Sequence, residues 1–158
     1  MNALIVYDSF FGNTEKIAQA IGQALGLKGN VATLRFNEVT AEAMKELDYL
    51  IVGSPTRAFK ASEGITKFLK DIPNEGIMNV KVAAFDTRVS IEDVNNRFLT
   101  TMVKLFGYAA EPIAKRLQKK GGIQVSTPEG FIVNGTEGPL KEGELERAAA
   151  WGKQIIEV

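Results

Sequence analysis

Buried strands and amphipathic helices alternate along this chain, and this alternation limits the possible folds more than any other feature. The apolar runs predict strands at residues 2–8, 31–36, 49–53 and 80–85, the second of them only half covered. Helical spacing predicts helices at residues 13–27, from about 62 to 72, at 91–120 in two pieces, and at 142–156, with a short helix at 41–46. A last strand is expected at 123–125 and 131–133, either split in two or folded as a small hairpin.

Strands that alternate with helices imply a parallel sheet, because each crossover returns right-handed and places a helix on one face. We therefore expect an α/β, doubly wound parallel sheet with helices on both faces. The first helix is expected to bury Ile17, Ile21, Ala24 and Leu25 and to end at Gly29 as its C-cap. The last helix is expected to bury Leu145, Ala148, Ala149, Ile155 and Ile156, and Trp151 to have a packing role.

The composition excludes several classes of chemistry. The chain has no Cys and no His, which removes disulfides, thiolate nucleophiles, His metal sites and His-based triads. Lys plus Arg equal Asp plus Glu at 19 each, so no overall field favours nucleic acid or an anionic membrane. We expect one domain over residues 1–158 and, without a long apolar or leader-like segment, a cytoplasmic location.

The junction between the first strand and the first helix is rich in hydroxyls and amides. Ser9, Gly12, Asn13 and Thr14 stand where the first helical turn has backbone N–H groups without an intrahelical acceptor. These groups, with the positive end of the helix dipole, suit a phosphate. The alternative is that Asn13 simply caps the helix.

Ligands of open parallel sheets bind beyond the carboxyl ends of the strands. Three such strand ends are rich in turn residues and donors, namely residues 9–14, 54–59 and 86–89. The sequence lacks the glycine fingerprint of dinucleotide-binding folds and the P-loop of NTPases. It also lacks the acidic cluster of a phospho-acceptor receiver domain, since the third strand ends in Gly53, Ser54 and Pro55. The three donor-rich loops at one edge of the sheet indicate a ligand of mononucleotide size.

The run IVYDSFFGNTEKIA at residues 5–18 resembles the phosphate-loop signature of the flavodoxin family. The similarity extends to the loop that begins at Gly53, to the fourth strand and to residues 130–151. This resemblance implies one short-chain flavodoxin-like domain, with a five-stranded parallel sheet in the order 2-1-3-4-5 that binds FMN non-covalently. It also implies a cofactor-binding set of Ser9, Phe10, Phe11, Gly12, Asn13, Thr14, Pro55, Thr56, Arg57, Phe59, Asp86, Thr87 and Arg88.

Three positions depart from the family pattern. Phe11 stands where the family usually has a hydroxyl residue, so one phosphate donor is lost. Ala58 stands where a Gly commonly lies beside the flavin, and an L-residue at positive φ costs about 1 kcal/mol more than Gly. Arg57 and Arg88 would make the flavin potential less negative if they face it. Alternatively, both arginines face solvent or pair with carboxylates.

The function implied is FMN-dependent electron transfer with a redox partner protein, and an electron carrier is favoured over a stand-alone enzyme. One alternative is an FMN-dependent NAD(P)H:quinone-type reductase, and another is a flavin-free interaction domain. The apolar segment at residues 98–106 exceeds one helical stripe, so part of it could meet a partner or a quinone-like substrate. No metal is expected.

Overall fold

A computed structural model describes residues 1–90 and 96–157 of the chain. Its sheet has the order β2-β1-β3-β4-β5, and β6 also pairs with β4. Every pairing is parallel. The strands are β1 (Asn2–Tyr7), β2 (Asn30–Arg35), β3 (Tyr49–Pro55), β4 (Lys81–Val89), β5 (Ile123–Gln124) and β6 (Glu129–Val133). The strand order 2-1-3-4-5 is confirmed, and the last position is a split strand and not a hairpin.

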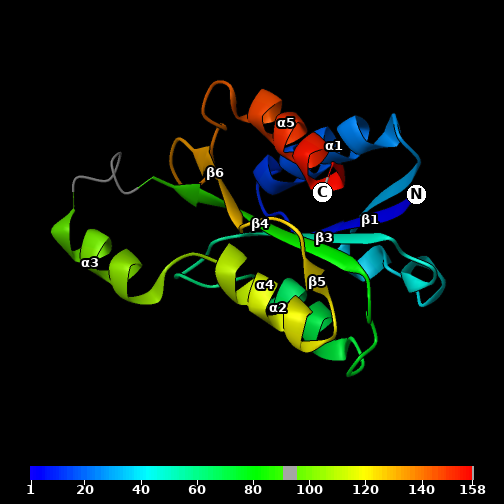
Figure 1. Cartoon of the computed structure of the whole chain (residues 1–158). Helices are drawn as coiled ribbons and strands as arrows, with labels where there is room; N and C mark the ends of the chain where they lie inside the picture. The colour runs from blue at the N-terminus through cyan, green and yellow to red at the C-terminus, as the bar shows by residue number, and fades with distance from the viewer. Residues whose placement is uncertain (91–95, 158) are drawn as a thin grey trace.

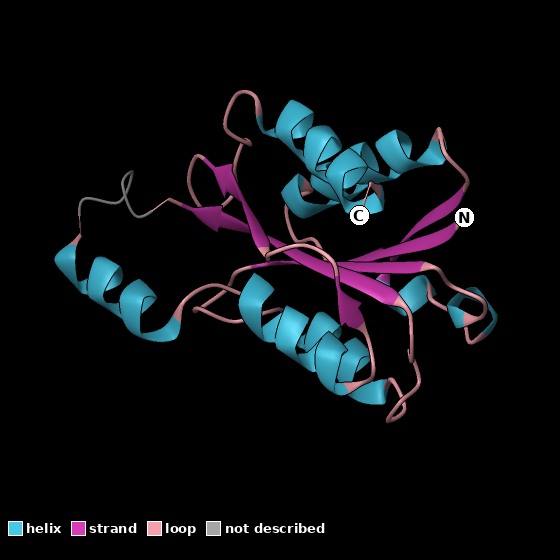
Figure 2. Cartoon of the chain, in the orientation of Figure 1, coloured by secondary structure: helices cyan, strands magenta, loops and turns pink. Residues whose placement is uncertain are grey.

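Two helix layers cover the sheet, as Figure 1 and Figure 2 show. One face carries α1 (Asn13–Gly26) and α5 (Glu144–Ile156), and the other carries α2 (Glu63–Asp71) and α4 (Ala110–Lys119). The β2–β3 connection holds only two short 3₁₀ turns, η1 (Phe36–Glu38) and η2 (Glu42–Met44). The helix expected at 41–46 is therefore one such turn. In the described residues no helix is long and apolar enough to cross a membrane.

Two helices form within the predicted segment 91–120, as expected, but they point in different directions. α3 (Arg97–Phe106) begins after Asn96, whose side chain accepts hydrogen bonds from the N–H groups of Phe98 and Leu99. Gly107 ends α3 at φ 70°, and Pro112 lies in the first turn of α4, where its missing N–H costs nothing. Figure 1 shows α3 beyond the carboxyl end of β4 and apart from both layers. Residues 91–95 of the predicted helix lie outside the described residues.

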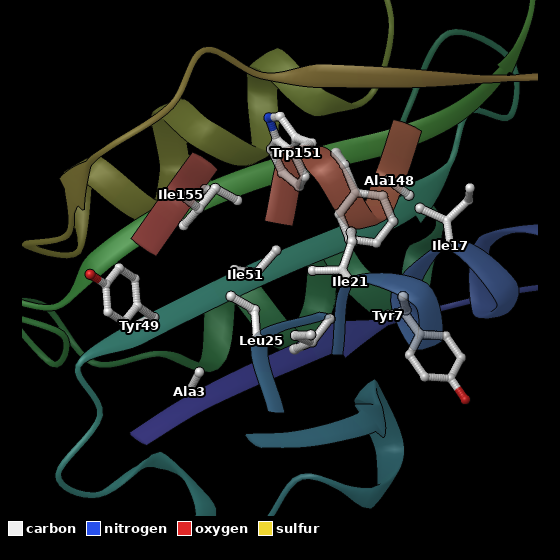
Figure 3. Close-up of a cluster of buried hydrophobic side chains, with 14 of the residues drawn as sticks. Ala3, Tyr7, Ile17, Ile21, Leu25, Tyr49, Ile51, Ala148, Trp151 and Ile155 are labelled. Carbon is white, nitrogen blue, oxygen red and sulfur yellow. The ribbon is translucent and has the colours of Figure 1, made fainter. Parts of the chain in front are cut away.

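The core has one apolar cluster on each face of the sheet. Figure 3 shows the cluster under α1 and α5, in which Trp151 and Ile155 point toward Ile21 and Ile51. Trp151 is buried, packs edge-on against Phe85 and donates its Nε1–H to the Ser126 hydroxyl at 3.0 Å. Its expected packing role is confirmed.

Two expectations about the helices are wrong, one about burial and one about a helix end. Leu145 is 41% exposed, because the buried stripe of α5 runs through Glu144, Ala148, Trp151 and Ile155 and leaves Leu145 at its edge. Gly29 is not the C-cap of α1, since that position is Leu27. A Cβ at Gly29 would lie 2.5 Å from the carbonyl oxygen of Met1, so Gly29 serves the close approach of two backbones.

Candidate functional site

The turn between β1 and α1 presents a group of backbone amides at the carboxyl edge of the sheet. Gly12 has φ 88° and is the N-cap of α1, without a side-chain cap bond, so the alternative in which Asn13 caps the helix is wrong. The Ser9 hydroxyl accepts the N–H of Gly12 at 3.1 Å. In the described part of the chain, the N–H groups of residues 10, 11 and 13–15 have no acceptor. Such amides at a helix start form an anion site.

The side chains of Asn13 and Thr14 tie this turn to two other loops. Asn13 donates one amide hydrogen to the carbonyl oxygen of Glu137 at 3.0 Å, and Thr14 Oγ1 lies 2.7 Å from Thr87 Oγ1 in a hydroxyl–hydroxyl hydrogen bond. Gly138 has φ 98°, which L side chains rarely adopt, and a Cβ there would lie 2.7 Å from the side-chain amide of Asn13. The β1–α1 turn is therefore held in place by β4 and by the segment after β6.

The β3–α2 loop forms a tight turn in an unfavourable backbone conformation. Arg57 and Lys60 exchange two backbone hydrogen bonds of 2.9 Å across Ala58 and Phe59. Ala58 and Phe59 have φ of 47° and 66°, a type of turn that prefers Asn-Gly. Ala58 therefore has the positive φ at which an L-residue costs more than Gly. The guanidinium of Arg57 lies over the ring of Phe10, 4.7 Å from its centroid, and connects this turn to the first loop.

Asp86 at the end of β4 is fully buried and forms the base of the site. Its two carboxylate oxygens accept hydrogen bonds of 2.7 Å from Nε and a terminal nitrogen of Arg88, and Oδ2 also accepts the N–H of Ala110 at 2.9 Å. Burial raises the pKa of Asp86 above its ordinary value, against the opposing effect of Arg88 and Ala110. Arg88 is thus paired with a carboxylate, as the alternative interpretation proposed.

The start of α4 is fastened to the same place. The guanidinium of Arg88 stacks 3.7 Å from the ring centroid of Tyr108, and Thr56 Oγ1 accepts the N–H of Ala109 at 3.1 Å. Asp86 and Thr56 therefore supply acceptors that α4 lacks in its own N-terminal segment, whose N-cap Ala109 has no side-chain cap bond.

A cavity of about 570 Å³ lies between these loops, at the carboxyl ends of the strands. This volume is in the range of small-molecule sites. The cavity is lined by every residue of the sequence-predicted set except Gly12 and Asp86. Gly12 shapes the first loop and Asp86 lies beneath the wall, so these two act on the cavity through their neighbours.

The comparisons with known proteins agree with this geometry. A family model described as a flavodoxin domain matches residues 4–104, well over half of the chain. The chain belongs to the flavodoxin family.

Members of the family are similar over nearly the whole chain. A flavodoxin of Aquifex aeolicus (strain VF5) is 28% identical over 98% of this chain and 84% of its own length. A flavodoxin of Clostridium saccharobutylicum is 25% identical, over 98% of this chain and 95% of its own. The solved structure of a flavodoxin from the domain Archaea superposes with a TM-score of 0.78 and 24% identity, covering 99% and 97% of the two chains.

Sequence reasoning missed part of the flavodoxin-like cavity. The lining that the sequence did not indicate comes from the α3–α4 connection and from the segment after β6, and includes Tyr108, Gly135 and Thr136. Val89 belongs to the predicted loop 86–89, and Leu99 and Val103 belong to the apolar segment 98–106. The segment after β6 could have been found, since it follows the carboxyl end of a strand at the same edge. Tyr108 could not, because its place depends on contacts between residues far apart in sequence, among them its stacking on Arg88 and the bonds from Asp86 and Thr56 to α4.

Proposed function

We propose that this chain binds FMN non-covalently and carries electrons to or from a redox partner protein. The observation that carries the proposal is the group of amides at the start of α1 that have no acceptor among the described residues, beside a cavity of ligand size. Bound FMN would supply the one- and two-electron chemistry of its isoalloxazine ring. The chain would supply binding, orientation and electrostatics.

The phosphate end of the cavity suits FMN even without the hydroxyl that Phe11 replaces. Ser9 accepts from Gly12 and keeps its own hydroxyl hydrogen to donate to a ligand. A lost charge-assisted hydrogen bond costs about 1.5–3 kcal/mol, or about one to two decades in affinity. The free amides and the positive end of α1 offset part of this loss.

The rest of the cavity has room for a flat ring. Phe10 and Phe11 line the cavity, and about 570 Å³ remains with both rings in place. In this proposal, Thr56, Arg57 and Phe59 lie along one side of the isoalloxazine. Thr87 and Arg88 border its other side and its pyrimidine edge.

The charges of the cavity support a potential less negative than that of an acidic flavodoxin. Arg88 is paired with Asp86 and contributes little net charge. Arg57 is exposed and forms no ion pair within the described residues. A cation in this position attracts the negative charge of a reduced flavin and stabilises that state. Arg57 is therefore the residue proposed to raise the potential.

The direct test mixes the purified chain with FMN, removes free FMN by gel filtration and records the absorbance spectrum. We expect a yellow protein with a spectrum shifted from that of free FMN. After photoreduction it should pass electrons to a protein acceptor such as cytochrome c, and NAD(P)H alone should not bleach it. Rapid bleaching by NAD(P)H without an added reductase would favour a reductase instead. Failure to retain FMN would leave a flavin-free interaction domain.

A further inference from the structure

α3 is an addition to the repeating strand–helix pattern of this chain. One helix suffices for each parallel crossover, and α4 already makes the one from β4 to β5. α3 precedes α4 and lies beyond the carboxyl end of β4 (Figure 1), at the edge of the sheet where the cavity opens. It therefore adds a wall that the three ligand-binding loops of the sheet do not provide.

One side of α3 lines the cavity. Leu99, Thr100 and Val103 contribute to its lining, whereas Phe98 and Leu105 are 69% and 71% exposed. The spacing of Leu99 and Val103 places them on one helical face. Thr100 donates its hydroxyl hydrogen to the carbonyl oxygen of Asn96, so it adds a methyl group and no free donor.

Residues outside α3 add apolar groups to the lining of the same cavity. Val89 at the end of β4 and the ring of Tyr108 line the cavity there. Arg88 beside Tyr108 has its charge paired with Asp86. The lining of the same cavity also includes hydrogen-bond donors, namely the hydroxyl of Thr56 and the guanidinium of Arg57. An uncharged, flat molecule with acceptor oxygens matches apolar walls with a few donors.

We propose that α3, together with Val89 and Tyr108, forms an acceptor subsite in which an uncharged quinone lies beside the cofactor. This proposal rests on FMN binding and names a small-molecule electron acceptor in addition to a protein partner. The reaction balances as reduced FMN plus quinone giving oxidised FMN plus hydroquinone. Two electrons and two protons pass to the two quinone oxygens, and a reduced redox partner protein supplies the next two electrons, with the protons taken from solvent.

Binding is tested apart from electron transfer by titrating 2-methyl-1,4-naphthoquinone into the protein loaded with oxidised FMN. Oxidised flavin has no electrons to donate, so a saturable change in its visible spectrum reports binding alone. Photoreduced protein mixed with the same quinone then gives the rate of reoxidation, which should saturate with quinone concentration.

Two neighbouring threonines of α3 provide a matched pair of variants. Thr100 lines the cavity and Thr101 is exposed, and each donates its hydroxyl to the carbonyl oxygen four residues earlier, at 3.0 and 2.9 Å. Thr100→Asp places a carboxylate in the apolar subsite and should weaken quinone binding by about tenfold or more. Thr101→Asp adds the same charge outside the cavity and should leave quinone binding unchanged. Val103→Asp is a second cavity-side variant in case Thr100→Asp does not fold.

FMN affinity, measured by fluorescence for each variant, separates this proposal from the proposed function. If the wild-type chain does not bind FMN, the proposed function fails and this inference fails with it. If FMN binds but quinone binding is not saturable, or is equal in Thr100→Asp and Thr101→Asp, the subsite is refuted and the electron carrier stands. If Thr100→Asp and Val103→Asp weaken FMN as much as the quinone, α3 is a wall of the cofactor site and the inference is wrong.

Discussion

Ala58 and Phe59 hold the most unfavourable residue conformations beside the cavity. Both have positive φ, at 47° and 66°, and neither is a residue that tolerates this region well. Backbone strain of this kind persists where the surrounding structure fixes it, and it gathers at binding sites. The two backbone hydrogen bonds between Arg57 and Lys60 and the contact of Arg57 with Phe10 are the constraints that fix the turn here.

Ala58→Gly is expected to stabilise the protein by about 0.5–1 kcal/mol, because the relief of strain exceeds the added entropy of the unfolded chain. The matched control is Ala41→Gly. Ala41 is exposed and has φ −57°, where Gly brings only the entropic cost, so this variant should be destabilised. Urea unfolding measures both free energies. Equal losses of stability in the two variants would show that the turn is not strained.

Arg57 is the residue expected to shift the reduction potential. Arg57→Gln keeps hydrogen-bond donors but removes the charge, so the two-electron midpoint potential of bound FMN should fall, by about 20 mV for an exposed cation. Lys67→Gln removes a charge from the exposed side of α2, outside the cavity lining, and should leave the potential unchanged. Potentiometric titration of the three proteins provides the comparison. A potential that does not move in Arg57→Gln would mean that the guanidinium does not sense the flavin.

At the scale of elements, the N-terminus of α5 is tied to β6 by an ionic cluster around one buried carboxylate. Glu144 is buried and accepts the N–H of Ile132 at 2.7 Å and a guanidinium N–H of Arg147 at 2.7 Å. Arg147 also lies 3.0 Å from Glu129 and over the ring of Phe131. These contacts turn α5 so that Glu144 faces the protein and Leu145 lies at the edge. The hydrophobic pattern does not show these contacts, so it wrongly placed Leu145 in the core.

The pH dependence of stability follows from this cluster. Burial by itself would raise the pKa of Glu144, but hydrogen bonds from Arg147 and Ile132 hold that pKa below its ordinary value. The folded state then binds a proton at Glu144 less readily than the unfolded state does. The ionised carboxylate therefore stabilises the protein above the unfolded pKa of this group, and this stabilisation is lost on acidification.

Glu144→Gln should therefore lose less stability than the wild-type protein between about pH 6 and pH 3. Urea unfolding at a series of pH values measures this difference. Glu142→Gln is the control, since Glu142 is exposed just before α5 and forms no ion pair within the described residues. If the free energy of unfolding falls as steeply with acidification in Glu144→Gln as in the wild type, the ionised Glu144 does not contribute to the pH dependence.

At the scale of the whole molecule, the sequence was sufficient for the sheet and insufficient for α3. The parallel sheet follows from the alternation of strands with helices, because parallel crossovers have one hand, and the strand order follows from the family resemblance. The three predicted loops meet because the carboxyl ends of parallel strands share an edge. The position of α3 depends on Gly107 and on the bonds from Asp86 and Thr56 that anchor α4, and no local pattern encodes such contacts.

The central claim is that the amides at the start of α1 bind the phosphate of FMN, and calorimetry with the chain free of flavin tests it most directly. FMN and riboflavin share the isoalloxazine and differ in the phosphate, so the ratio of their affinities isolates this contact. We predict that FMN binds about 100-fold or more tightly than riboflavin. Ser9→Ala should narrow that ratio by weakening FMN alone. Equal affinities for the two ligands, or no heat with either, would contradict the account.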